Sequence, residues 1–269
     1  MKSDYQYAFR DNAKGVSEVD KVYISKSDQF EHYLFDRYVI PYVQKIKIKE
    51  VLVDIGSGEG RYSEYFGKDF KKVIALEPDE QRYANSFKNL KHLQNTECIH
   101  GTVNDVPKNI IADVIINIHV LQHVHSSAVD EILNYTTSQL KIGGLFILAI
   151  TKKTDIDEPW NIAWQEGKKA LYSAVPETIF EYITVKNIPG ILPVRKVGLE
   201  EIEVELKNRG FKIEHSIEYA PHLEKKPSII EKIFMFFYRH FPPSIYNSIK
   251  ELPGHPRYAD VLLIARKIS

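Results

Sequence analysis

The chain has 269 residues, 43% of them apolar, and its 36 lysines and arginines balance its 36 aspartates and glutamates. This length and composition allow a full hydrophobic core and exclude an intrinsically disordered protein. The zero net charge excludes a global attraction to nucleic acid or to an anionic membrane.

The cysteine content and the apolar runs indicate where such a protein would reside. The single cysteine, Cys98, cannot form an internal disulfide, which fits a reducing compartment. The first residues have no apolar signal segment, and no apolar run reaches the length of a membrane span. We therefore expect a cytoplasmic protein without a transmembrane segment.

The predicted elements begin with a tyrosine-rich segment, residues 1–50, in which an amphipathic pattern over 28–45 predicts a helical cap. From residue 51, short β-branched runs alternate with helical patterns, as in βαβ units. Strands are predicted near 51–55, 73–77, 97–100, 113–118, 145–150, 211–219 and 259–266. Helices are predicted over 61–67, 78–89, 128–140 and 199–209, the third ended by Gly143 and Gly144 and the last by Gly210. The pattern predicts an α/β sheet of seven strands.

Two long stretches, 152–198 and 221–257, interrupt the core formed by 51–151 and 199–269. Because structureless loops of this length are uncommon in compact domains, we expect both inserts to contain helices and to form a substrate lid. Trp160 and Trp164 either line an acceptor site or form the small core of the first insert. The apolar aromatic run 229–238 predicts a helix packed on the core, with a substrate pocket, a dimer surface or a membrane-surface contact as alternatives.

The most informative stretch is Asp54-Ile55-Gly56-Ser57-Gly58-Glu59-Gly60-Arg61, directly after the first predicted strand. Its alternate glycines allow positive φ angles and a close approach of the backbone to a ligand. The second predicted strand ends in an acid, Glu77. Together, the loop and the acid predict a nucleoside-cofactor site. The dinucleotide fingerprint G-x-G-x-x-G would need glycine at Arg61, which disfavours an NAD-dependent oxidoreductase.

The order Asp54-x-Gly56-x-Gly58-x-Gly60 after Val-Leu-Val resembles the first motif of class I S-adenosylmethionine-dependent methyltransferases. The segment Val120-Leu121-Gln122-His123-Val124 resembles the stretch after strand four in small-molecule, type 11-like members. The resemblance covers about residues 50–151 well and the final strands loosely. It implies a Rossmann-like, doubly wound sheet, mostly parallel with an antiparallel last strand. It also implies S-adenosylmethionine as cofactor and S-adenosylhomocysteine as product.

The resemblance also implies roles for single residues. The glycine loop wraps the amino acid end of the cofactor, Glu77 binds both ribose hydroxyls, and Asn117 lies beside the methionine moiety. Arg61 either attracts the cofactor carboxylate or forms a surface ion pair. Many relatives have an acid behind the glycine that binds the adenine amino group, whereas this chain has Thr102, whose hydroxyl is the expected substitute. The cofactor-binding residues expected in this way are Asp54, Gly56, Ser57, Gly58, Arg61, Glu77, Pro78, Thr102, Val103 and Asn117.

Methyl transfer from a sulfonium is an in-line displacement, so alignment of the acceptor is the main requirement. A hydroxyl acceptor would also use a general base, which accelerates reactions about 10²–10⁴-fold. His119 is the first candidate for this base and His123 the second; otherwise both are packing or helix-start residues. His125 is expected to be exposed. No carboxylate or cysteine stands at a ligand spacing from these histidines, so no metal site is predicted.

We therefore expect methylation of a small or medium metabolite, with O-methylation first and N-methylation next. RNA or protein methylation is an alternative, disfavoured by the neutral charge and by the absence of an Asn-Pro-Pro-Tyr-like motif after strand four. A non-catalytic S-adenosylmethionine-binding module is another, motivated by Thr102. The expected partner is a small-molecule acceptor and not nucleic acid, and a homodimer is left open.

Overall fold

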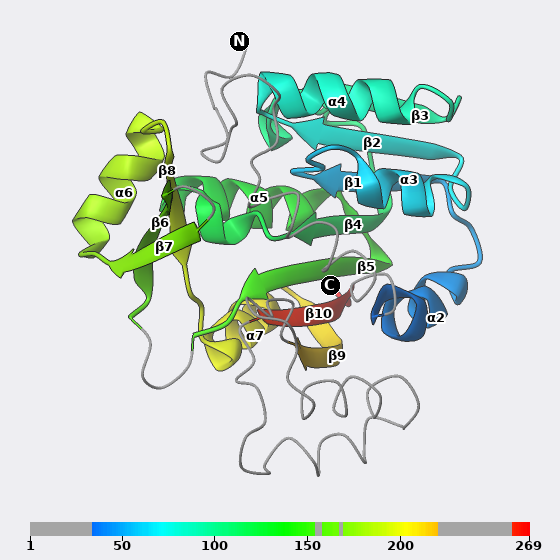
Figure 1. Ribbon diagram of the computed structural model, residues 1–269. Helices are drawn as coiled ribbons and strands as arrows, with labels where there is room; N and C mark the ends of the chain where they lie inside the picture. Colours follow the sequence, from blue (N-terminus) through cyan, green and yellow to red (C-terminus); the bar gives the residue numbers. More distant parts are fainter. Residues whose placement is uncertain (1–33, 154–157, 167–168, 220–259) are drawn as a thin grey trace, which may run out of the picture.

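A seven-stranded sheet forms the centre of the protein in the computed structural model, which describes residues 34–153, 158–166, 169–219 and 260–269 (Figure 1). The strand order is β3-β2-β1-β4-β5-β10-β9. β1 to β5 are parallel, and β10 runs antiparallel to both of its neighbours. The predicted Rossmann-like sheet with an antiparallel last strand is confirmed.

The elements of this core lie within a few residues of the predicted ones. The strands are β1 (Val51–Ile55), β2 (Lys72–Glu77), β3 (Thr96–His100), β4 (Ala112–Ile118), β5 (Leu140–Thr151), β9 (Phe211–Tyr219) and β10 (Asp260–Lys267). The helices are α2 (Ile40–Gln44), α3 (Arg61–Gly67), α4 (Glu80–Leu90), α5 (Ser126–Gln139) and α7 (Leu199–Asn208). Three short turns of helix complete the core: η1 (Phe35–Val39), η2 (Val103–Asp105) and η3 (Leu121–His123).

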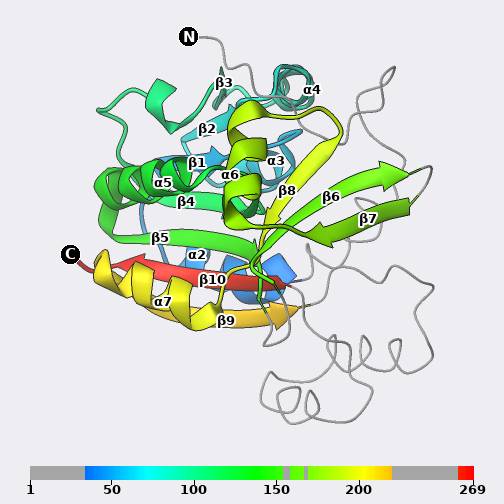
Figure 2. The same ribbon diagram turned by 90° about the vertical axis from the view of Figure 1, so that its left-hand side faces the viewer.

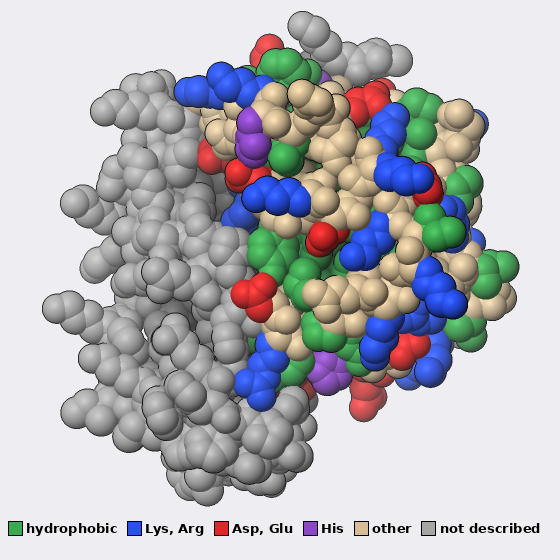
Figure 3. Space-filling view, turned by 90° about the vertical axis from the view of Figure 1, so that its right-hand side faces the viewer, with side chains coloured by type: hydrophobic (Ala, Val, Ile, Leu, Met, Phe, Trp, Pro, Cys, Tyr) green, Lys and Arg blue, Asp and Glu red, His purple; other side chains and the backbone are tan. Residues whose placement is uncertain are grey.

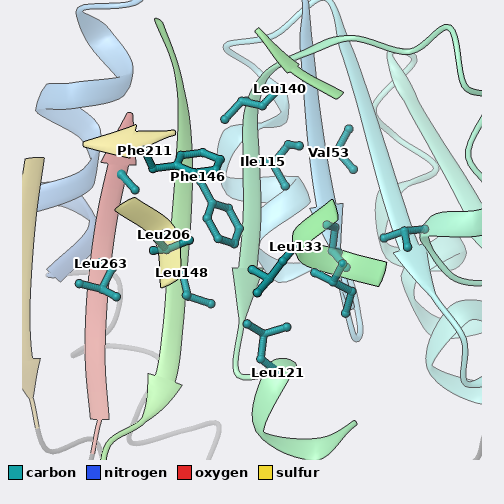
Figure 4. Packing of buried hydrophobic residues seen from close by; sticks show 14 of the residues in the cluster. Val53, Ile115, Leu121, Leu133, Leu140, Phe146, Leu148, Leu206, Phe211 and Leu263 are labelled. Atoms are coloured by element: carbon teal, nitrogen blue, oxygen red, sulfur yellow. The ribbon is translucent and has the colours of Figure 1, made fainter. Parts of the chain in front are cut away.

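Each face of the sheet is covered by its own apolar layer, because successive strand residues point to opposite faces. Leu52 of β1 belongs to the layer beneath η1, α2 and α3, where Phe35 stacks on Tyr62 at 4.7 Å between ring centroids. The next residue, Val53, belongs to the opposite layer, which includes Leu133 of α5 and Leu206 of α7 (Figure 4). All seven residues of β4 are buried, as expected for a central parallel strand.

The end of α5 differs from the prediction. Gly143 and Gly144 do not end this helix, which stops at Gln139; both glycines lie inside β5. Between the pairs Ala112–Leu140 and Val114–Leu145, β5 advances five residues while β4 advances two, so the extra residues bulge from the sheet. Gly143 takes a φ of 82°, which a bulge of this kind favours. The glycine pair was therefore correctly read as a break and wrongly placed.

The helix predicted over 28–45 is described only from residue 34 onward. There the chain forms η1, a π-helical turn, followed directly by α2 with Pro41 in its first turn. Phe35, Val39 and Val43 are buried against the sheet. The described part of the N-terminal segment is thus helical as predicted, while residues 1–33 lie outside the described residues.

The insert 152–198 contains one helix, as predicted, but consists mainly of strands, which were not predicted. β6 (Trp160–Glu166), β7 (Lys169–Ala174) and β8 (Ile191–Arg195) form a separate antiparallel sheet in the order β7-β6-β8, with one helix, α6 (Glu177–Lys186). Burial alternates along residues 160–164, which is the two-residue period of a strand. Figure 2 shows this sheet beside one end of the large sheet. The second insert, 221–257, lies outside the described residues.

None of the described helices is long and apolar enough to cross a membrane.

Candidate active site

The glycine loop after β1 has the backbone form that its sequence predicts. Gly56, Gly58 and Gly60 have φ angles of 70°, 58° and 86°. A Cβ atom on Gly56 would overlap the side chain of Val120, and one on Gly60 would lie 2.7 Å from Leu90. The backbone N–H of Ser57 donates to the carbonyl of Leu76 at 2.7 Å, which fixes the loop against β2. Glycine is therefore required here by both conformation and space.

Glu77, the last residue of β2, is tied to this loop. Its Oε2 accepts from the backbone N–H of Gly58 at 2.8 Å, and its Oε1 accepts from that of Asp79 at 2.9 Å. Burial raises the pKa of Glu77, and the charge of Arg82 together with the two backbone donors opposes that rise. The carboxylate is thus held rigidly at the carboxyl edge of the sheet, where ligands bind in open α/β folds.

Asp54 is buried beneath the same loop rather than at its surface. Ser63 of α3 donates its hydroxyl to Asp54 Oδ2 at 2.7 Å. Burial raises the pKa of Asp54 to about 7, and the bonds from Ser63 only partly oppose that rise. Asp54 therefore links the end of β1 to α3, the helix that follows the glycine loop.

Ser57 Oγ and Asn117 Oδ1 are among the oxygen atoms near the loop that are buried and have no hydrogen-bond partner in the described part of the chain. Asn117 is the penultimate residue of β4, and its Nδ2 donates to the carbonyl of Ile55 at 3.4 Å. Buried polar atoms without a partner are rare and costly in folded proteins. Two of them at the ends of β1 and β4 fit a ligand with hydrogen-bond donors, such as an amino acid moiety.

Arg82 is a neighbour of this site that the sequence analysis missed. Its guanidinium approaches Gly58, lying 3.4 Å from where a Cβ on that residue would stand. Its charge also opposes the rise in the pKa of Glu77. Arg82 is held by Asp79, which caps α4 and accepts the Arg82 backbone N–H at 2.8 Å. Arg82 lies in the first turn of α4, the helix that follows Glu77, and this position in the sequence could have identified it as a neighbour of the site.

The other predicted cofactor residues are partly engaged within the protein. The hydroxyl of exposed Thr102 accepts from the N–H of Asn104 and donates to Asp105, both at 3.4 Å, and so caps η2. Val103 is buried. Arg61 lies 4.5 Å from the ring centre of Tyr62 and donates to its hydroxyl at 2.7 Å. The Pro78 carbonyl contacts His100 Nε2 at 3.0 Å. Their roles toward the cofactor stay predictions.

The two candidate bases lie at the end of β4. His119 has a φ of 57°, unusual for a residue with a side chain, and its N–H donates to the Ala149 carbonyl at 2.9 Å. Its Nε2 lies 3.1 Å from the Tyr219 hydroxyl. His123 Nδ1 lies 2.7 Å from the Pro193 carbonyl of β8. Burial lowers the pKa of His123 to about 4, so this imidazole is neutral near pH 7.

A cluster of charged and aromatic side chains, which we call the Arg195 clamp, joins the first insert to α5. Arg195 of β8 lies 4.8 Å from the Trp160 ring centre and 5.3 Å from that of Phe180. It donates to Glu181 of α6 at 3.2 Å and to Ser126 at 3.0 Å. Trp160 therefore belongs to the small core of the insert.

His125 is also part of this junction and is only partly exposed. Its Nε2 lies 2.8 Å from Glu181, and its Nδ1 accepts from the N–H of Ser127 at the start of α5. The side chain of His125 is 35% exposed, so it is less exposed than the sequence predicts and is paired with Glu181. The described residues contain no group of three or more His, Cys, Asp or Glu side chains that would hold a metal ion.

Comparison with known proteins agrees with this geometry. A family model described as a methyltransferase domain matches residues 53–148, from β1 into β5. An S-adenosylmethionine-dependent methyltransferase from Clostridium acetobutylicum has the same fold, with a TM-score of 0.54 and 12% identity over 92% of each chain. The YcgJ protein from Bacillus subtilis gives a TM-score of 0.54 and 15% identity over 89% of this chain and 99% of its own. No curated protein sequence is significantly similar to this one.

A third structure, the glycopeptide N-methyltransferase MtfA complexed with S-adenosylmethionine, gives a TM-score of 0.50 and 13% identity over 84% of this chain and 90% of its own. Identities this low show the fold alone, whereas the family match rests on the sequence from the glycine loop to β5. Residues 53–148 thus match the methyltransferase-domain family, and the fold is that of S-adenosylmethionine-dependent methyltransferases. The predicted enzyme class and cofactor are thereby confirmed.

Proposed function

We propose that this enzyme methylates a small or medium metabolite, most simply at a hydroxyl oxygen, at the carboxyl edge of the large sheet. The observation that carries the proposal is the joining of the glycine loop to Glu77 through the N–H of Gly58. This bond places an ionisable acid and three residues with positive φ angles around one point. Such a point suits a nucleoside whose ribose has two adjacent hydroxyls.

In this proposal each group of the protein has one task. The second lone pairs of the Glu77 carboxylate accept from the ribose hydroxyls, since each oxygen has one bond within the protein. Ser57 and Asn117 bind the amino acid moiety through their unpaired oxygens. Bound S-adenosylmethionine supplies an activated methyl group. Thr102, Val103, Arg61 and Pro78 complete the proposed cofactor contacts.

His119 is proposed as the base. Methylation of a hydroxyl oxygen would require the acceptor proton to leave. His119 Nε2 can receive a proton through the Tyr219 hydroxyl, because a phenol both accepts and donates hydrogen bonds. One proton arrives at the Tyr219 oxygen as another passes to Nε2. His123 fits this task less well, since its Nδ1 is bound to Pro193 and its pKa is lowered to about 4.

A small acceptor is favoured over nucleic acid by the charge distribution. The chain has no net charge. Among the described residues on the face that Figure 3 shows, lysines and arginines alternate with aspartates and glutamates. A nucleic-acid enzyme is expected to present a basic surface, because phosphate contacts supply most of the affinity. Cytoplasmic residence and a homodimer belong to the same proposal; the single thiol of Cys98 supports the first.

The test is the affinity of the purified protein for S-adenosylmethionine, measured by calorimetry with the Glu77→Ala variant. Loss of two hydrogen bonds to an ionised group, worth about 1.5–3 kcal/mol, should weaken binding about 10- to 150-fold. Glu80→Ala, three residues on and exposed, is the matched control and should change affinity by less than about threefold. Equal affinity of folded Glu77→Ala and the unchanged protein would refute the proposed ribose contact.

The acceptor is tested by incubating the protein with metabolite extracts and a labelled methyl donor. Label in an alkali-stable ether, or in an ester, would support O-methylation, and label on an amine would assign N-methylation instead. Label found in RNA or protein fractions alone would overturn the small-molecule proposal. A protein that binds the cofactor and transfers no label to any fraction would be a binding module.

A further inference from the structure

Gln122, a buried residue of η3, lies between the two histidines at the end of β4. Its Oε1 accepts from the backbone N–H of Thr151 at 2.8 Å, and its Nε2 lies 3.2 Å from His123 Nε2. The same Oε1 lies 3.4 Å from His119 Nδ1. One amide therefore contacts both imidazoles, through opposite ends.

The orientation of this amide follows from its backbone partner. The Thr151 N–H can only donate, so the atom facing it must be the Gln122 oxygen. The Gln122 NH₂ group then points at His123 Nε2 and needs a lone pair there. A hydrogen on that nitrogen would oppose the amide donor. His123 is thereby assigned its proton at Nδ1.

The other side of His123 gives the same answer independently. The Pro193 carbonyl can only accept, and it lies 2.7 Å from Nδ1, so that nitrogen must carry the proton. Both ring nitrogens are satisfied in one neutral tautomer. Protonation would place a second hydrogen at Nε2, against the amide donor. The lowered pKa of His123 agrees with this arrangement; its causes are burial, the charges of His119 and Arg82, and, opposing them, the Pro193 carbonyl and Asp260.

The same logic applies to His119. The Gln122 oxygen faces Nδ1, which therefore carries the proton, and the lone pair of Nε2 faces the Tyr219 hydroxyl. The left-handed backbone at His119 costs free energy, and such strain persists only where surrounding contacts hold it. Here the Ala149 carbonyl, Gln122 and Tyr219 hold the residue on three sides.

We propose that Gln122 is the positioning residue of the acceptor side, because it sets both histidines to the Nδ1–H tautomer. His123 is then a neutral residue that ties the end of β4 to the insert. In His119, Nε2 is left as the basic atom. The proposed role of His119 as base rests on the proposed function; the tautomers and the tether do not. The 70-residue separation of His123 and Pro193 means that this tether joins the catalytic edge to β8. Gln122 thus links the position of β8, through His123, to the orientation of His119.

The test is nitrogen-15 NMR of the histidine rings in the cofactor-free protein. In the unchanged protein, both His119 and His123 should show the proton on Nδ1, and His123 should stay neutral down to about pH 5, given its pKa of about 4. A proton on His123 Nε2, or a His123 titration near pH 6.5, would overturn the proposal without any variant. Because cofactor binding is measured separately by calorimetry, failure here is distinct from failure of the proposed function.

Gln122→Glu then tests the mechanism, because it replaces the amide donor with an acceptor of the same shape. A carboxylate facing Nε2 should favour protonated His123 and raise its pKa by about 1–3 pH units. Gln139→Glu is the matched control: it makes the same change at the last residue of α5, a helix about 20 Å long that begins four residues after Gln122, and should leave the His123 titration unchanged.

Tyr219→Phe is the second variant. It should alter the His119 Nε2 resonance, since that atom loses its donor, and leave His123 as it was. A His123 titration that is unmoved by Gln122→Glu in a folded protein, or a His119 Nε2 resonance unmoved by Tyr219→Phe, would show that these contacts do not set the tautomers.

Discussion

The proposed cofactor side and the proposed acceptor side of the protein are held together by different kinds of contact. On the cofactor side, the glycine loop and Glu77 meet through backbone N–H groups, within 19 residues of chain. On the acceptor side, histidine side chains contact groups that are far away in the sequence. His123 lies 70 residues from Pro193, whose carbonyl it contacts, and His119 lies 100 residues from Tyr219. The first arrangement depends on backbone conformation, and the second on the packing of β8 of the insert and β9 of the core beside the end of β4. Substitutions on the two sides should therefore have different effects on the stability of the protein.

The largest effect is expected from Gly56→Ala on the cofactor side. The new Cβ would sit in a left-handed conformation, costing about 1–2 kcal/mol, and would overlap Val120, costing about 1–3 kcal/mol more. Chemical denaturation should show a loss of about 2–5 kcal/mol. Gly190→Ala, in the insert, is the matched control: its φ is 79° with no atom within 4 Å of the added Cβ, so only the conformational cost applies. Equal losses in both variants would contradict the role given to Val120.

The next effect is a pH dependence that arises from Asp54. Its pKa is about 7 in the folded protein against 3.8 as the ordinary value, so the folded state binds a proton more tightly than the unfolded state. Stability should therefore be highest below about pH 4, fall as the pH rises towards 7, and level off above it. The fall due to Asp54 should be about 4 kcal/mol, from about three pH units at about 1.4 kcal/mol each.

Asp54→Asn, which keeps an oxygen for the Ser63 hydroxyl, checks this expectation by denaturation at several pH values. The variant should be more stable than the unchanged protein at pH 8 and should show a flatter pH profile. A slope will remain, because the pKa of Glu77 is raised in the same direction. Parallel profiles for the two proteins would exclude Asp54 as the source.

A smaller and more local effect is expected from Arg195→Met in the Arg195 clamp. Removing the cation leaves Glu181 partly buried without this donor, which should cost about 2–3 kcal/mol. Because the clamp joins the insert to α5, hydrogen exchange should accelerate in β6 to β8 and stay slow in β1 and β4. Cofactor affinity should be retained. Adding Glu181→Gln to this variant should recover part of the lost stability. A uniform loss of hydrogen-exchange protection across both sheets would contradict the division into two sides.

This division also explains how far the sequence could be interpreted. The loop, Glu77 and the strands of the core were predictable because short-range patterns determine them: alternate glycines, β-branched runs and an acid at a strand end. Gln122 was visible only as part of a motif, since its partner Thr151, and the Pro193 carbonyl that contacts His123, become neighbours through the fold. The strands of the insert were missed because each is only five to seven residues long, too short to distinguish from a helix segment by its pattern of apolar residues.

The position of β10 has a consequence for synthesis of the protein on the ribosome. β10 lies between β5 and β9, yet it comprises residues 260–267, later in the chain than every other strand of the sheet. Until it has been translated, one edge of β5 lacks its neighbour and β9 has no place to pair. An open strand edge of this kind invites association between nascent chains. The large sheet can therefore close only after β10 has been translated.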